Sequence, residues 1–447
     1  MPTFEFKSTM PCSAHDLFHY HQSPGAFTRL APPWMRVASL GAEPGIEEGS
    51  RREMRIHKGP FFLTWVAEHR TLEAGLGFRD VQVRGPFRHW EHSHLFEPAS
   101  SFRSTLSDRV EVTLPLGLPA TPFRLEQQME RLFSFRHHRT RSDLARHAAF
   151  TNKPDNVLIA GRVDAFARDL AAFLSVGGSR VFRLRPERLR SGDMRFKMTP
   201  FFSEQACHPL DGADAVIHTG RSYDDPGAEE DAEMTYLCRA MEIVGQPPPL
   251  LLHLQGGHPC LDHYTRDPSL PLGQASRRTR ETEASLAWRA RLDSLFVRVV
   301  NLHFGELIRA PFGFLADLLL HLETFLFLGG GARSPHFCWI SQDDAVAAVL
   351  HVLCSTSFQG DLAVVAPQTA TRAELQQALV KRSLAAYTFN RMLKVLPGFA
   401  PGRDPRLDLD LDHMPQLAHR GFSFSCTRLG LAVGAALGDV ELSSVID

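Results

Sequence analysis

The sequence predicts an α+β domain, then an α/β domain with a parallel sheet, and finally a small helical domain. The chain has 447 residues, more than one ordinary domain holds. Its first third contains alternating, strand-like segments and ends in one long helical segment. After residue 155, short apolar strands alternate with helical segments, which is typical of a parallel sheet. We place the three domains at residues 1–150, 155–385 and 386–447.

The N-terminal domain is expected to be a curved antiparallel sheet that grips one long helix. Ser13 is a candidate N-cap for a helix within residues 13–22, because its hydroxyl can accept a first-turn amide. The long helix covers residues 123–148, and its apolar stripe consists of Leu125, Met129, Leu132, Phe133 and Phe135. This arrangement leaves room for a cavity between sheet and helix. The expected strands are 4–10, 51–58, 61–70, 77–85, 89–98 and 104–115.

The second domain begins with an apolar strand at 157–161, followed by an amphipathic helix that ends at Gly177 and Gly178. Asp343 and Asp344 open a later helix, where acidic residues interact favourably with the helix dipole, so structural capping explains them better than catalysis. Further strands are expected at 180–184, 215–219, 250–257, 295–307 and 361–367.

Composition excludes several classes of protein. The net charge of −1 gives no general attraction to nucleic acid. Seven scattered cysteines without a Cys-x-x-Cys pair fit a reducing compartment, and the first residues carry no apolar signal core, so we expect a cytoplasmic protein. The most apolar stretch, 312–328, contains Asp317, His321 and Glu323. We therefore expect a buried helix there and no stable membrane insertion.

The turn after the strand at 157–161 has the outline of a dinucleotide-binding loop with altered chemistry. A Gly-x-x-Gly-x-x-Gly spacing would place glycines at 161, 164 and 167, but the chain has Gly161, Asp164 and Ala167. Glycine lets the backbone approach a pyrophosphate that rests on the helix N-terminus. Asp164 adds a side chain and a negative charge at that position, so we expect dinucleotide binding to be weak or lost.

Several downstream segments resemble the epimerase family of atypical short-chain dehydrogenase/reductases. They include CWISQDDAVAAVLHVL (338–353) and GDLAVVAPQTATRAELQQAL (360–379), in the family's order along the chain. The N-terminal third resembles the START-like polyketide cyclase and lipid-transfer superfamily, through the PPW at 32–34, residues 77–97 and the long helix. The resemblance implies a START-like helix-grip domain, then a Rossmann-like doubly wound parallel sheet with a small helical C-terminal domain. It also implies a hydrophobic small-molecule ligand and NADP as the cofactor.

The chain departs from the epimerase family at the positions that would act on substrate. In the loop 255–268, Pro259 and Cys260 align with the family's tyrosine, and Tyr264 is displaced from it. Residue 268 is proline, where such a tyrosine needs lysine. Tyr264 is therefore only a weak catalytic candidate, and the catalytic residues stay unknown.

Two cofactor positions are also assigned by the resemblance. His218 ends a strand where the family has asparagine. Arg185 follows the strand at 180–184, where an arginine would face the 2′-phosphate of NADP, and a simple surface arginine is an equal alternative.

Aromatic and histidine side chains mark the N-terminal domain. Trp34, Trp65 and Trp90 either line an apolar ligand pocket or belong to the core. His92 and His94 share one face of a strand and could bind a metal ion, but two histidines within a sheet are more often satisfied by neighbouring groups. The sequence thus predicts no metal site.

Two functions remain open. One is a pseudo-oxidoreductase that binds an apolar molecule in its START-like domain. The alternative is an active NADP-dependent reductase or epimerase with a small hydrophobic substrate. The ligand, the oligomeric state and the pathway are not predicted.

Overall fold

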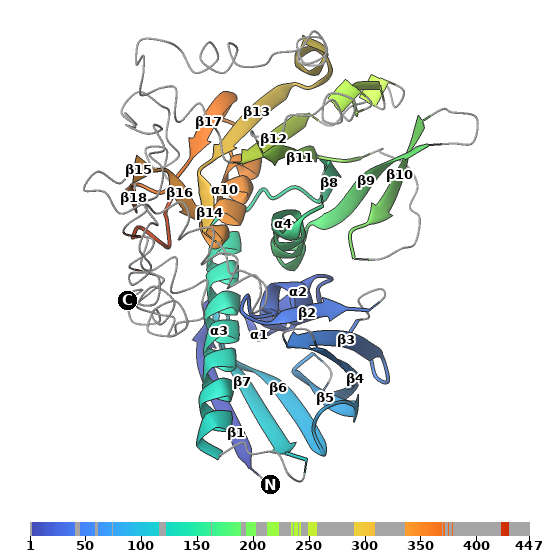
Figure 1. Ribbon diagram of the computed structural model, residues 1–447, viewed down its shortest axis with the longest axis vertical. Coiled ribbons are helices and arrows are strands. Elements are labelled where there is room, and N and C mark those ends of the chain that lie inside the picture. The colour runs from blue at the N-terminus through green and yellow to red at the C-terminus, as the bar shows by residue number, and fades with distance from the viewer. Residues whose placement is uncertain are drawn as a thin grey trace, which may run out of the picture.

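The computed structural model contains two large sheets joined by one long helix (Figure 1). The first, antiparallel sheet belongs to the N-terminal part, and the second, mainly parallel sheet to the part after residue 155. The structure describes residues 2–40, 45–58, 61–73, 75–115, 122–161, 163–188, 194–202, 212–222, 234–242 without 236 and 240, 249–256, 290–308, 336–371 without 369, 374, 378 and 422–428.

The first sheet is fully antiparallel and has the order β1-β7-β6-β5-β4-β3-β2. Consecutive strands from β2 to β7 are neighbours, and β1 closes on β7. The long helix α3 covers one face of this sheet. The elements are β1 Thr3–Met10, α1 Ala14–Gln22, α2 Ala26–Leu30, β2 Arg36–Ser39, β3 Arg51–Lys58, β4 Phe61–Glu73, β5 Gly77–Arg84, β6 His89–Ser100, β7 Arg103–Thr113 and α3 Pro122–Ala148.

Helix α3 packs on the sheet through its predicted apolar stripe. Leu125, Met129 and Phe133 form one buried cluster with Trp90 and Val110 from β6 and β7. Burial of these side chains stabilises the helix, since each large apolar side chain contributes about 1.5–3 kcal/mol. At the other end of the sheet, the Ser13 hydroxyl accepts the amide of Asp16 and caps α1, as predicted.

The second sheet has the order β10-β9-β8-β11-β12-β13-β17, with every pair parallel except β10–β9. The strand order reverses between β8 and β11, which is the point where ligands bind in open α/β sheets. The elements are β8 Asn156–Gly161, α4 Ala165–Val176, β9 Arg180–Arg188, β10 Met194–Pro200, β11 Ala215–Ser222, β12 Leu250–Gly256, β13 Arg298–Phe304, α10 Gln342–Cys354 and β17 Gly360–Val364. Two small pairs flank it: β14 Glu306–Ile308 with β16 Trp339–Ser341, and β15 His336–Phe337 with β18 Ala370–Thr371.

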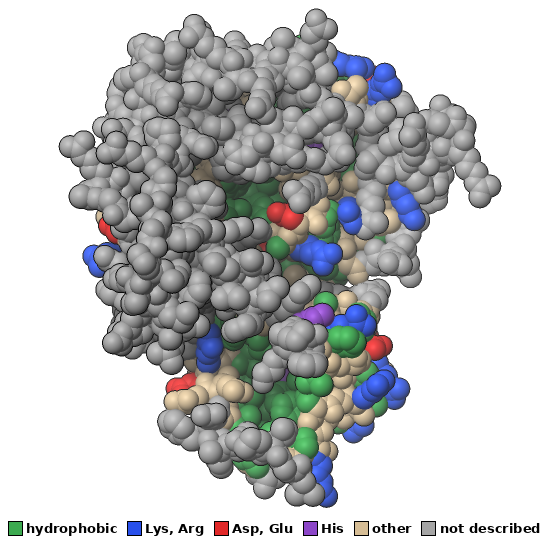
Figure 2. Space-filling model, viewed as in Figure 1, with side chains coloured by type: hydrophobic (Ala, Val, Ile, Leu, Met, Phe, Trp, Pro, Cys, Tyr) green, Lys and Arg blue, Asp and Glu red, His purple; other side chains and the backbone are tan. Residues whose placement is uncertain are grey.

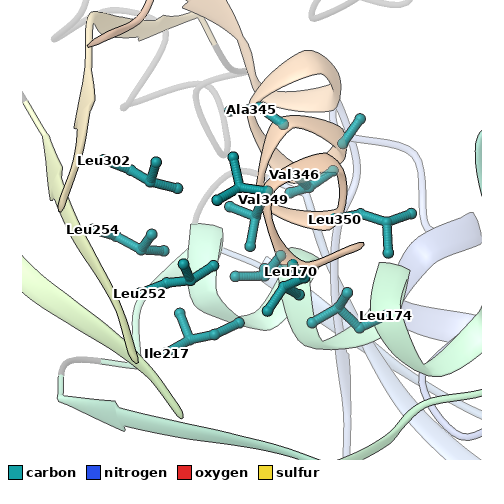
Figure 3. Close-up of a cluster of buried hydrophobic side chains, with 14 of the residues drawn as sticks. Leu170, Leu174, Ile217, Leu252, Leu254, Leu302, Ala345, Val346, Val349 and Leu350 are labelled. Atoms are coloured by element: carbon teal, nitrogen blue, oxygen red, sulfur yellow. The ribbon is translucent and has the colours of Figure 1, made fainter. Parts of the chain in front are cut away.

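Helices α4 and α10 cover the same face of the second sheet. Figure 3 shows Leu170 and Leu174 of α4 beside Val346 and Leu350 of α10, against leucines and isoleucine from the strands. All of these side chains are buried, as expected for a parallel sheet. This core fixes the N-terminus of α4 next to the end of β8.

A buried network of charged side chains connects the two parts of the chain. Arg29 of α2 forms a two-pronged ion pair with Asp143 of α3, with both N–O distances 2.8 Å. The same guanidinium reaches Asp169 of α4 at 2.8 Å and Asp343 of α10 at 3.5 Å. Arg139 of α3 also pairs with Asp343. Burial opposes the charge of Arg29, but Asp143 and Asp169 outweigh it and raise the pKa of the guanidinium.

The helix predicted to open at Asp343 and Asp344 is present as α10, with both aspartates in its first turn, but its N-cap is Ser341. Ser341 caps the helix by accepting the amide of Asp344. The buried carboxylate of Asp344 accepts the amides of Ser425 and Cys426 and pairs with Arg146 of α3 at 2.6 Å. Asp344 therefore ties a late segment of the chain to α10 and α3.

The predicted mixture of an antiparallel and a parallel sheet is confirmed. Strands β2 and β10 were not predicted, and the strand expected at 295–307 begins at Arg298, because residues 290–295 are helical. Most of the predicted helical C-terminal domain at 386–447 lies outside the described residues. In the described part of the chain, no helix has both the length and the apolar character needed to cross a membrane.

Candidate functional site

The turn after β8 keeps the backbone geometry of a tight strand-to-helix turn. Gly161 has φ of +86°, in the left-handed region that favours glycine. A Cβ at this position would lie 2.5 Å from the carbonyl oxygen of Thr219 on β11. The Thr219 hydroxyl in turn donates to the carbonyl of Ala160 at 3.0 Å. Close packing of β8 against β11 is therefore reason enough for glycine at 161.

Asp164 occupies the N-terminus of α4. It is the N-cap residue, and its Oδ1 accepts the backbone amide of Ala167 at 2.9 Å. In dinucleotide-binding α/β folds this end of the helix carries the pyrophosphate. Here a carboxylate already accepts one of the amides that would bind phosphate, and it adds a negative charge. Ala167 itself is fully buried. These residues do not fit a bound pyrophosphate.

Three buried histidines lie on the central strands, and His218 is in the middle of β11, which continues to Ser222, rather than at the strand end as predicted. His218 of β11 is directly opposite His253 of β12, and their ring centroids are 5.1 Å apart. His303 follows on β13. The His218 imidazole also lies close to Gly161, with Nε2 3.1 Å from the position of a Cβ there. The structure thus brings Gly161, Asp164, Ala167 and His218 together at the switch point of the sheet.

The structure does not place Arg185 or Tyr264, the other two residues predicted for the second part, beside these four. Arg185 lies within β9, which continues to Arg188, and it pairs with Lys197 on the edge strand β10. It is therefore inside a hairpin strand rather than just beyond the strand end. Tyr264 lies outside the described residues.

Two of the three predicted pocket tryptophans come together. The rings of Trp65 and Trp90 meet edge to face, with centroids 5.1 Å apart, and Phe87 contacts both. Trp34 has different ring partners: it meets Phe135 at 5.1 Å and lies under the Arg131 guanidinium. Trp65 and Trp90 thus form an aromatic group beside α3, and Trp34 lies against another side of that helix.

Next to this aromatic group, strand pairing assembles a buried set of histidines and aspartates that the sequence interpretation missed. His69 on β4, Asp80 on β5 and His92 on β6 are direct cross-strand neighbours. His94 on β6 is directly opposite Asp108 on β7. His92, His94 and Asp108 are at most 7% exposed. We call Asp80, His92, His94 and Asp108 the histidine–aspartate cluster.

Each carboxylate of this cluster contacts several imidazoles. Asp108 accepts Nε2 of His92 at 3.0 Å and Nε2 of His137, from α3, at 2.6 Å. Nδ1 of His94 is 2.7 Å from Asp108 Oδ1, and Nε2 of His94 contacts Asp80 at 3.3 Å. The cluster is therefore held from the sheet and from the helix at once.

These contacts separate the pKa values of two adjacent histidines. Burial lowers the pKa of His94, but Asp108 and Asp80 outweigh burial and raise it to about 9. Burial and the charge of His94 lower the pKa of His92 to about 4. Burial raises the pKa of both aspartates, but their histidine partners outweigh it and hold each pKa well below its usual value. Without a bound cation, the two carboxylates therefore favour a proton on His94, whereas His92 favours the neutral form.

The sequence places His92 and His94 on one strand, but only the strand register shows that Asp80 and Asp108 are their neighbours. The spacing of His92 and His94 places both on one strand face. Asp80 and Asp108 are 12 or more positions away, and only the pairing of β5, β6 and β7 makes them neighbours.

Comparison with solved structures shows the fold across almost the whole chain. A nucleoside-diphosphate sugar epimerase from Corynebacterium glutamicum matches 99% of this chain and 91% of its own, with 20% identity and a TM-score of 0.69. The aromatase/cyclase Zhui from a Streptomyces species matches 33% of this chain at 16% identity, with a TM-score of 0.28. A START superfamily protein from Mycobacterium smegmatis matches 31% at 12% identity, with a TM-score of 0.26.

The match to the epimerase structure includes both sheets and thus a shared two-part architecture. The two lower TM-scores do not establish a shared fold. No protein-family model matches the sequence, and no curated protein matches it.

Proposed function

We propose that this chain is an epimerase-family pseudo-oxidoreductase that binds an apolar small molecule in its N-terminal part. Its α/β part serves as a scaffold with weak or no affinity for NADP. The observation that carries this proposal is the carboxylate of Asp164 on the N-terminal amide of Ala167.

The electrostatic argument supports loss of the cofactor. A helix N-terminus attracts anions because its first amides are unpaired and its dipole is positive there. Asp164 uses one of these amides and cancels part of that field. A diphosphate would lose a hydrogen bond and meet a like charge, and a tenfold loss of affinity needs only about 1.4 kcal/mol.

The aromatic group supports a ligand in the N-terminal part. Trp65 is partly buried, and its Nε1 is buried without a hydrogen-bond partner among the described residues. A buried indole N–H normally finds an acceptor, which a bound molecule would supply. Figure 2 shows hydrophobic side chains gathered beside α3 over the strands of the first sheet. Apolar surface with a few polar groups is typical of small-molecule sites.

A second candidate function is an NADP-dependent reductase or epimerase on a small hydrophobic substrate. The overall match to an epimerase structure favours it. The altered chemistry at Asp164 and Ala167 opposes it, since hydride transfer requires a bound cofactor.

NADPH binding to a matched set of variants separates the two candidates. Asp164→Gly removes both the carboxylate and the cap, whereas Asp164→Asn keeps a capping oxygen and removes only the charge. We expect the wild type to bind NADPH with a Kd weaker than about 1 mM, and both variants to bind at least about tenfold more tightly. If the wild type binds in the micromolar range, the pseudoenzyme proposal is wrong. If Asp164→Gly binds no better than the wild type, Asp164 is not the obstacle.

Mass spectrometry of molecules that co-purify with the protein tests the ligand proposal. We expect a retained apolar compound in the wild type, reduced occupancy in Trp65→Phe, which lacks the indole N–H, and unchanged occupancy in the control Trp34→Phe. A wild-type protein that retains no small molecule would contradict this part of the proposal.

A further inference from the structure

We propose that Asp80, His92 and His94 bind one zinc ion inside the N-terminal part of the chain. This inference does not depend on whether the α/β part binds a dinucleotide. Each of these residues offers one ligand atom, and the three atoms lie within 4.8 Å of one another.

The two distances from Asp80 to the histidines are close to those around a tetrahedral ion. Asp80 Oδ2 lies 3.3 Å from His94 Nε2 and 3.8 Å from His92 Nδ1. Zinc bound at about 2.0–2.1 Å requires about 3.3–3.4 Å between neighbouring ligand atoms. All three ligand atoms lie within 4.8 Å of one another, so the two imidazoles would have to move closer together around the ion. Two imidazoles and one carboxylate are also a donor set that zinc accepts.

The opposite nitrogens of both imidazoles are already oriented by one carboxylate. Asp108 Oδ1 is 3.0 Å from His92 Nε2 and 2.7 Å from His94 Nδ1. Histidine ligands of zinc almost always donate their second N–H to a carboxylate, a carbonyl or water. The His92 contact has hydrogen-bond geometry, whereas the His94 contact is a close N–O approach without it, and both rings direct their other nitrogen toward Asp80.

A further layer of contacts fixes the two carboxylates. His137 Nε2 donates to the second oxygen of Asp108 at 2.6 Å, and the Ser8 hydroxyl contacts His137 Nδ1 at 2.9 Å. On the other side, His69 Nε2 is 3.1 Å from Oδ1 of Asp80, and the Ser50 hydroxyl contacts His69 Nδ1 at 3.0 Å. Strands β1 and β4, the residue before β3, and helix α3 therefore all contribute to the positions of the proposed ligands.

The site has three protein ligands, so the fourth tetrahedral position is open to water or a ligand oxygen. Three ligands plus one open position is the pattern of zinc sites that act on a bound molecule, whereas structural zinc sites use four protein ligands. The Trp90 ring centroid lies 6.4 Å from that of His92, so the site adjoins the aromatic group.

Zinc titration of the full-length protein tests the proposal. The protein is stripped with a chelator, and Zn²⁺ is added in competition with a chromophoric chelator. We expect one zinc per chain with a Kd tighter than about 1 µM. Co²⁺ added to the stripped protein should give the intense visible absorption of a tetrahedral site. The wild type alone decides the main point: less than about half a zinc per chain at about 10 µM free metal, or a purely octahedral cobalt spectrum, overturns the proposal.

Variants identify the residues. His92→Gln and Asp80→Asn should each abolish stoichiometric binding, whereas Asp108→Asn, which changes only the orienting carboxylate, should weaken it about 10–100-fold. The matched control is His19→Gln, because His19 is exposed on α1 and outside the cluster. Circular dichroism confirms that each variant is folded. Unchanged binding by folded His92→Gln or Asp80→Asn would contradict the assigned ligands.

Discussion

Arg29 is the residue whose removal should reveal most about how the two parts of the chain are joined. Its side chain is 1% exposed, and the Asp143 carboxylate opposite it is fully buried. Arg29→Met removes the two 2.8 Å contacts to Asp143 and the 2.8 Å contact to Asp169 while keeping a long apolar side chain. Asp143 would keep the hydroxyl of Tyr20 at 2.9 Å as its close donor.

The expected loss in the free energy of unfolding follows from the buried charge of Asp143, which Arg29→Met leaves without its partner. Removing one partner of a buried ion pair costs about 3–5 kcal/mol, mostly because the other charge stays buried without compensation. We therefore expect Arg29→Met to lower the free energy of unfolding by about 3–5 kcal/mol. Asp143→Asn in the same background removes the stranded charge and keeps an oxygen for Tyr20. The double variant should recover at least about 2 kcal/mol of that loss.

Urea unfolding measures these differences, followed by circular dichroism and by tryptophan fluorescence. Coincident transitions by the two probes justify the comparison of free energies. The control is Arg51→Met, which removes a surface pair with Glu68 and should cost no more than about 1 kcal/mol. A loss below about 1 kcal/mol for Arg29→Met, or strictly additive effects with Asp143→Asn, would refute the reasoning.

Three further predictions concern His147 of α3, where it packs against the α/β part, and two glycines of that part. Burial lowers the pKa of His147 from 6.5 to about 4, so its stabilising effect is complete above pH 6.5 and is lost as the pH falls toward 4. From pH 7 to pH 5 the free energy of unfolding of the wild type should therefore fall by about 2 kcal/mol more than that of His147→Gln. Urea titrations that show equal losses for the two proteins would contradict this prediction. A Cβ on Gly177 would overlap the His147 ring. Gly177→Ala should therefore lower the free energy of unfolding by about 1–3 kcal/mol in the wild type, and by much less in a protein that also carries His147→Ala. Gly161→Ala should cost about 2 kcal/mol or more from its positive φ and the nearby Thr219 carbonyl; a neutral effect on the melting temperature would show that the turn is not tight.

Local patterns in the sequence were enough to predict several elements of the fold. The apolar stripe of residues 123–148 appears as α3, with Leu125, Met129 and Phe133 buried as predicted. The Ser13 cap also follows from short-range rules, because a capping side chain acts within three residues, and so does the acidic first turn of α10, although its cap is Ser341.

What the sequence could not predict depends on contacts between distant segments. Nothing near Arg29 in the sequence indicates that it reaches Asp143, Asp169 and Asp343, on three other helices. A lone arginine in a short helix normally faces solvent. The burial of this charge results from tertiary packing alone.

The candidate sites show the same division. Asp164 could be identified from the spacing of one turn, and the structure adds that its carboxylate caps α4. The histidine–aspartate cluster could not be assembled, because two strand registers must be known before Asp80 and Asp108 face His92 and His94. Alternation within one strand identifies a face but not its neighbours.

The proposed function rests most on the absence of tight dinucleotide binding by the α/β part. Calorimetric titration of NADPH into the wild-type protein tests it most directly. We predict no saturable heat up to about 1 mM NADPH, since Asp164 places its carboxylate on the amide that would bind phosphate. A single-site isotherm with a Kd of about 10 µM or tighter would contradict the claim.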